Sequence, residues 1–106
     1  MAAVDRTSPA AVTGASGLDE IVVSVAEELD MSNVEVVRGQ VEALLAVNPA
    51  SLAFDLAELT FMDSSGIALL VQTATRVEAI SLRQVPGIIR RVLEATGVTE
   101  VLAVEQ

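Results

Sequence analysis

The hydrophobic residues of the chain change several times between alternating and helical spacing. Compact or alternating apolar stretches predict strands near residues 11–13, 21–26, 52–56, 80–83 and 101–104. Apolar residues three and four positions apart predict helices near residues 33–47, 65–78 and 87–96. Strands that alternate with helices imply right-handed crossovers. We therefore expect an α/β fold with a mixed, mainly parallel β-sheet of four to five strands and α-helices packed on it.

The ends of these elements carry local signals. Residues 27–30 are expected to turn the chain after a buried strand. Ser32 and Glu35 have the spacing of a capping box, which predicts that the first helix begins there. Gly97 is expected to end the last helix. Residues 1–19 are rich in small and polar residues, so we expect a flexible N-terminal arm that contributes at most one edge strand, followed by one domain over 20–106.

Composition and charge narrow the functional classes. The chain has 15 acidic residues against six arginines and a net charge of −9, so we expect no direct nucleic-acid binding and instead a basic protein partner. No apolar run approaches the roughly 18 residues that span a bilayer, and no signal-peptide pattern opens the chain. We therefore expect a cytoplasmic protein without a membrane segment.

The chain contains no Cys, His, Lys, Tyr or Trp. Thiol chemistry, Cys or His zinc sites, Schiff bases and the usual general base are therefore excluded. Asp55, Glu58 and Asp63 could offer oxygen ligands to a hard cation, but their spacing matches no calcium loop, and a solvated acidic rim is the simpler interpretation. We expect no enzyme activity, no cofactor and no required metal.

Residues 61–67, Phe-Met-Asp-Ser-Ser-Gly-Ile, are the most informative segment. Ser64 and Ser65 precede a helical pattern, where a hydroxyl commonly caps backbone N–H groups. A nucleophilic role is disfavoured because no base is present and the segment is not Gly-x-Ser-x-Gly. Phosphorylation is the third possibility. Gly66 is unfavourable within a helix, which indicates that another group comes close to its backbone.

These residues, together with three other segments in the same order, resemble the STAS domain, and in particular the stand-alone bacterial anti-sigma factor antagonists. The resemblance covers roughly residues 20–104 and is carried by residues 28–30, 52–56, 61–67 and 90–98. Asp-Ser-Ser-Gly is its most specific part, and the late Arg-Val-Leu-x-x-Thr-Gly is a second match. One departure is Glu27, which stands where the family usually has Gly.

The resemblance implies a single STAS-like domain that acts by partner switching. The unphosphorylated antagonist binds an anti-sigma factor that is also a serine kinase, which releases a sigma factor. Phosphorylation of Ser64, directly after Asp63, ends the binding, and a phosphatase restores it. The alternative is a ligand-sensing or scaffolding STAS module of a stress-signalling assembly. The partner-binding residues are expected to be Asp30, Met31, Met62, Asp63, Ser64, Ser65 and Gly66.

Overall fold

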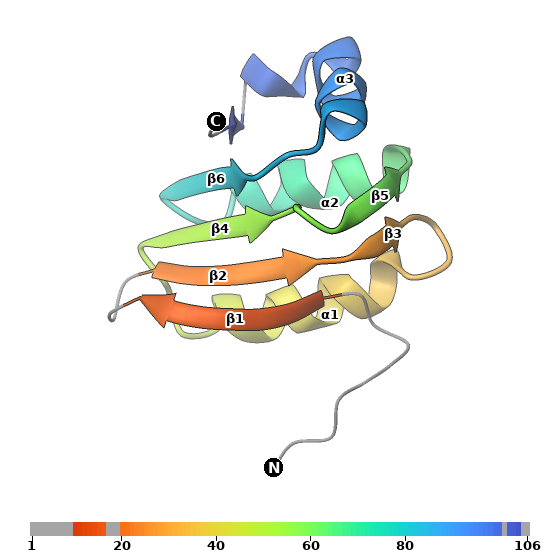
Figure 1. Ribbon diagram of the computed structural model, residues 1–106. Helices are drawn as coiled ribbons and strands as arrows, with labels where there is room; N and C mark the ends of the chain where they lie inside the picture. Colours follow the sequence, from red (N-terminus) through yellow and green to blue (C-terminus); the bar gives the residue numbers. More distant parts are fainter. Residues whose placement is uncertain (1–9, 17–19, 101, 105–106) are drawn as a thin grey trace.

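The computed structural model of the chain describes residues 10–16, 20–100 and 102–104 and shows a sheet with the strand order β1-β2-β4-β6-β7 (Figure 1). Its edge strand β1 is antiparallel to β2, and the other neighbours are parallel. The expected mixed, mainly parallel sheet is therefore confirmed. The strands are β1 (Ala10–Ser16), β2 (Glu20–Val25), β4 (Ser51–Asp55), β6 (Ala79–Arg83) and β7 (Ala103–Val104).

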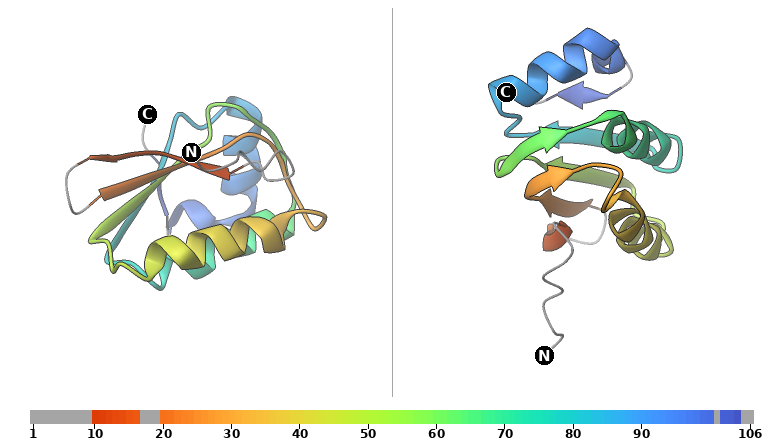
Figure 2. Two further views of the ribbon diagram at one scale, coloured as in Figure 1. Left: turned by 90° about the horizontal axis from the view of Figure 1, so that it is seen from below. Right: turned by 90° about the vertical axis from the view of Figure 1, so that its right-hand side faces the viewer.

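Three helices connect the parallel strands, as the sequence predicts. They are α1 (Val34–Leu45), α2 (Ser64–Ala74) and α3 (Gly87–Thr96), and a short 3-10 helix (Val98–Glu100) follows α3. Helices α1 and α2 lie side by side against one face of the sheet (Figure 2). Helix α3 packs beside the short strand β5 described below. This arrangement leaves the first turn of α2 at one end of the sheet.

The core is aliphatic and lies between the sheet and the helices. Val23, Phe54 and Leu82 occupy one row across β2, β4 and β6, and each is at most 1% exposed. Because Phe54 is the only aromatic residue of this core, the packing depends on closely fitted Val, Leu and Ile side chains. The helices contribute the buried residues Val34, Val37, Val41, Leu45, Ile67, Leu69, Leu70, Ile89 and Leu93.

The predicted turn at residues 27–30 is wrong. Residues of β3 (Glu27–Leu29) pair in parallel with β5 (Leu59–Met62), a strand that the sequence did not predict. Glu27 has a φ of 64°, which kinks the chain after β2 and lets it resume as β3. In Figure 1, β3 continues in the direction of β2, and β5 continues in the direction of β4. The β3–β5 pair therefore lies at the end of the molecule towards which β2 and β4 point.

The expected capping box is also wrong. Asn33, not Ser32, is the N-cap of α1, and the Ser32 hydroxyl donates to Asp30 Oδ1 at 2.5 Å instead. Glu35 forms an ion pair with Arg38 at 3.4 Å rather than reaching back to the cap. At the other end of the fold, Gly97 ends α3 in the left-handed conformation with a φ of 79°, which confirms that prediction.

Candidate functional site

The candidate site lies where β3 and β5 end. The chain leaves β3 into residues 30–33, which lead to α1, and leaves β5 through Asp63 into α2. Because β3 and β5 pair in parallel as a separate two-stranded sheet, both exits lie at the same end of that pair. Ligand and partner sites of α/β proteins are commonly built at the carboxyl ends of parallel strands. The topology therefore brings the two segments highlighted by the sequence together.

Asp63 is the centre of this arrangement. It is the N-cap of α2, and its Oδ1 accepts hydrogen bonds from Ser65 N at 2.8 Å and Gly66 N at 3.4 Å. Its Oδ2 accepts a hydrogen bond from Met31 N at 3.3 Å. Its own N–H donates to the carbonyl oxygen of Leu29 at 3.3 Å. One side chain therefore caps the helix and binds the segment that follows β3.

Neither serine is the helix cap, so the capping hypothesis for Ser64 and Ser65 is wrong. Ser64 is the first residue of α2 and is exposed, whereas Ser65 is half-buried. Within the described residues, no hydrogen bond engages the Ser64 hydroxyl, and the amides of Ser65 and Gly66 in the first turn donate to Asp63 instead. Ser64 is therefore exposed, and its hydroxyl is not the cap of α2.

The segment between β3 and α1 is held by its own polar groups. Asp30 Oδ1 accepts hydrogen bonds from both the hydroxyl and the backbone N–H of Ser32, at 2.5 Å and 2.9 Å. Asn33 Oδ1 accepts from Asp30 N at 3.0 Å, and Asn33 Nδ2 donates to the Glu28 carbonyl at 2.8 Å. The Ser32 hydroxyl bond, followed by the Ser32 backbone bond, lowers the pKa of Asp30 below 3.8.

Gly66 allows the two segments to approach closely. A Cβ at this position would lie 2.9 Å from the Leu29 carbonyl oxygen and 2.7 Å from Met62 Cγ. The expectation that a group comes close to the Gly66 backbone is therefore confirmed. The group is the end of β3, and the tight contact fixes the position of residues 29–31 against α2.

The structure separates the expected contact residues into exposed and buried ones. Met31 is 78% exposed and Ser64 is exposed, so both can meet a partner. Met62 is only 4% exposed and Gly66 is buried, so neither residue offers much surface to a partner, and their expected part in partner binding stays a prediction. Phe61, which sequence reasoning missed, is 50% exposed. Because β5 was not predicted, nothing in the sequence decided which of Phe61 and Met62 faces the core.

The surroundings of the site are acidic. Glu27 and Glu58 are exposed where the β3–β5 pair begins, and Glu28 is exposed opposite Phe61. Over residues 10–16, 20–100 and 102–104, no three acidic side chains are grouped so as to hold a metal ion. Asp55, one of the possible ligands, accepts a hydrogen bond from Ala57 N at 3.0 Å. In the same part of the chain, no helix is long and apolar enough to cross a membrane.

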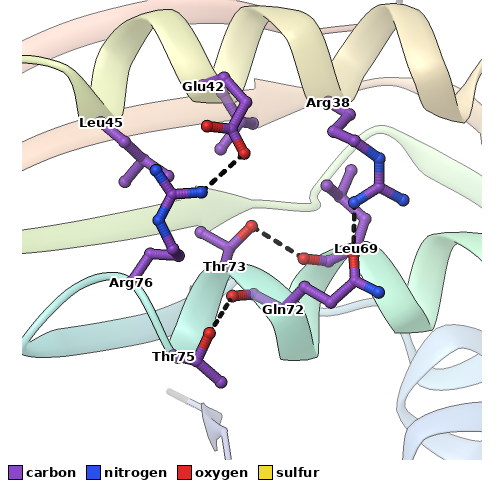
Figure 3. A pocket seen from close by; sticks show the side chains of 9 residues that line it. Arg38, Glu42, Leu45, Leu69, Gln72, Thr73, Thr75 and Arg76 are labelled. Carbon is purple, nitrogen blue, oxygen red and sulfur yellow. Dashed lines mark hydrogen bonds and ion pairs between the residues drawn. The ribbon is translucent and has the colours of Figure 1, made fainter.

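A separate cleft of about 160 Å³ lies between α1 and α2 (Figure 3). Two polar pairs span it: Arg76, which follows the end of α2, donates from Nη1 to Glu42 Oε2 at 2.8 Å, and Arg38 of α1 donates to the Gln72 side-chain oxygen of α2. Pockets that bind small molecules commonly measure about 300–1,000 Å³. The cleft is smaller, and its two arginines are already bonded, so it does not favour a small-molecule site.

Solved structures with the same fold include an anti-sigma factor antagonist from Mycobacterium paratuberculosis. It is 24% identical, with a TM-score of 0.82 over 90% of this chain and 82% of that chain. The anti-sigma factor antagonist SpoIIAA in its unphosphorylated form is 18% identical, with a TM-score of 0.70 over 92% of this chain and 87% of that chain. The Bacillus cell fate determinant SpoIIAA in the phosphorylated form is 20% identical, with a TM-score of 0.69 over 92% and 91%.

At these identities the solved structures show a shared fold. The comparison with curated proteins finds no match for the chain. The family model described as "Mlab, STAS domain" matches residues 12–104, which is well over half of the sequence and includes every helix and both segments of the candidate site. The chain therefore belongs to the STAS domain family.

Proposed function

We propose that the chain is an anti-sigma factor antagonist, which binds an anti-sigma factor with serine kinase activity and thereby releases a sigma factor. The role is supported by two solved structures with the same fold, both of which are anti-sigma factor antagonists. The observation that carries the proposal is the state of Ser64, an exposed serine whose hydroxyl has no bond within the described residues. Asp63 supplies the helix cap, so a modification of Ser64 leaves the capping interaction intact.

Phosphorylation of Ser64 is the proposed switch. The kinase transfers the γ-phosphoryl group of ATP: a bond forms between Ser64 Oγ and the γ-phosphorus, and the bond from that phosphorus to the β,γ-bridging oxygen breaks. The hydroxyl proton passes to a base of the kinase, and ADP leaves. The product carries nearly two additional negative charges. A phosphatase would reverse the step by hydrolysis of the new ester.

The new phosphate would remain on the surface. The first-turn amides of Ser65, Gly66 and Ile67 already donate to Asp63, so they are not free to bind a phosphate. The phosphate would lie beside the Asp63 carboxylate and face the partner. Repulsion and desolvation amounting to about 4 kcal/mol would weaken binding roughly a thousandfold.

The proposed docking surface combines exposed apolar side chains with acidic ones. Met31 and Phe61 are 78% and 50% exposed. Glu28 lies opposite Phe61 in the β3–β5 pair and is exposed as well. A partner with a basic rim around an apolar contact would complement this surface. The protein would act by binding alone, in the cytoplasm, without a cofactor and without catalytic turnover.

Binding measurements with candidate anti-sigma kinases test the proposal. We expect Ser64→Ala to bind as tightly as the wild type and to remain bound when ATP is added. Ser64→Asp should bind at least tenfold more weakly while its melting temperature stays near that of the wild type, because the hydroxyl has no structural role. If Ser64→Asp binds with unchanged affinity and ATP fails to release the wild type, the scaffolding alternative replaces the switch.

A further inference from the structure

Met31 is linked to Asp63 by one backbone hydrogen bond. Its backbone N–H donates to Asp63 Oδ2 at 3.3 Å, and within the described part of the chain no other hydrogen bond involves Met31. The neighbouring residues Asp30, Ser32 and Asn33 are bonded to one another instead. The Met31 side chain is 78% exposed, so packing contributes little to holding it.

The two carboxylate oxygens of Asp63 serve different elements. Oδ1 accepts the amides of Ser65 and Gly66 and so caps α2, whereas Oδ2 accepts the amide of Met31. An asparagine at this position keeps one oxygen, which is sufficient for a helix cap. Its NH2 group donates and cannot accept the Met31 N–H. The substitution Asp63→Asn therefore separates the cap from the link to Met31.

We propose that Asp63 is a positioning residue, which holds Met31 beside Ser64 so that a protein partner contacts the methionine and the serine as one surface. The tight contact between Gly66 and Leu29 supports the same arrangement, because it fixes the chain directly before Asp30 against α2. The partner's identity rests on the proposed function. The positioning itself is a property of this chain and can be tested without a partner.

The first experiment measures backbone amide exchange by NMR in the wild-type chain and in Asp63→Asn. We expect the exchange rate of the Met31 amide to rise about threefold or more, while the Ser65 amide changes by less than twofold. Asp55→Asn is the matched control, because Asp55 makes a similar bond to Ala57 N at 3.0 Å. It should leave Met31 unchanged. An unchanged Met31 amide in Asp63→Asn would overturn the inference.

A second variant is needed in case Asp63→Asn also weakens the N-cap of α2. If Ser65 also exchanges faster in Asp63→Asn, Asp63→Ser is used, because serine caps helices but is too short to reach Met31. Protected Ser65 with faster Met31 exchange then supports the inference. If the Met31 and Ser65 amides of Asp63→Ser both exchange as slowly as in the wild type, Asp63 does not position Met31.

The second experiment measures binding to an anti-sigma factor kinase for Met31→Ala, Asp63→Asn and the double variant. We expect each single substitution to weaken binding about tenfold. The affinity of the double variant should be at most about threefold lower than that of the single variant that binds less tightly. Such non-additivity indicates that the two residues act through one contact. Fully additive losses would contradict the inference. If no anti-sigma factor binds the wild type, the proposed function fails, and the amide measurements still decide the positioning role.

Discussion

A side chain on Gly66 of α2 would collide with Leu29 of β3: a Cβ there would lie 2.9 Å from the Leu29 carbonyl oxygen. Replacing glycine by alanine within a helix ordinarily stabilises a protein by about 1 kcal/mol. At position 66 the overlap with backbone reverses the sign. We expect Gly66→Ala to lower the free energy of unfolding by about 1–3 kcal/mol, measured by chemical denaturation.

The matched control for this substitution is Gly39→Ala in α1. Gly39 is exposed, and a Cβ there would have no neighbour within 4 Å. We expect Gly39→Ala to raise the free energy of unfolding by about 0.5–1 kcal/mol. If both alanine variants are more stable than the wild type, the close contact between Gly66 and Leu29 does not constrain the fold.

Glu27 occupies the left-handed backbone region with a φ of 64°. A side chain at such a position costs about 1 kcal/mol or more, and glycine avoids that cost. We therefore expect Glu27→Gly to raise the melting temperature by roughly 4–8 °C. Glu27→Gln, which removes the charge and keeps the side chain, is the control. Equal gains from both variants would indicate that charge repulsion, not backbone strain, destabilises position 27.

The lowered pKa of Asp30 implies that the stability of the fold depends on pH. Hydrogen bonds from Ser32 lower the pKa of Asp30 in the folded state below the ordinary 3.8. The ionised Asp30 carboxylate therefore stabilises the folded state. This contribution is fully present above pH 3.8 and is lost as the pH falls through the lower pKa of Asp30 in the folded state. In Ser32→Ala, the pKa of Asp30 should move up towards 3.8, as measured by carboxyl NMR titration. An unchanged titration midpoint in that variant would refute the assigned cause.

The main elements could be predicted because their signals are local. Helix α3 begins and ends at the expected residues, since Pro86 precedes its first turn and Gly97 stops it. The strands β2, β4 and β6 follow from short apolar or alternating runs. The pair β3–β5 could not be predicted, because Glu27 and Glu28 are exposed acids that look like a turn. Their strand conformation depends on parallel pairing with a distant segment.

The residues of the candidate site could be named from the sequence, but their exposure could not. Asp63, Ser64 and Met31 were named mainly from the resemblance to the STAS domain, and the structure brings the segments that carry them together where β3 and β5 end. The burial of Met62 and the exposure of Phe61 are set by the register of β5, which leaves no local signal. The cap was misassigned because aspartate and serine are both good N-caps, and only the backbone geometry distinguishes Asp63 from the serine after it.

The most direct test of the account is phosphate incorporation into Ser64→Ala and Ser65→Ala, compared side by side. Each protein is incubated with ATP and the anti-sigma kinase that binds the wild type, and the added phosphate is located by intact mass and fragment mapping. Ser64 is exposed and Ser65 is half-buried, so the account predicts that Ser65→Ala gains one phosphate at Ser64 and that Ser64→Ala gains none. Normal labelling of Ser64→Ala together with loss of labelling in Ser65→Ala would contradict it.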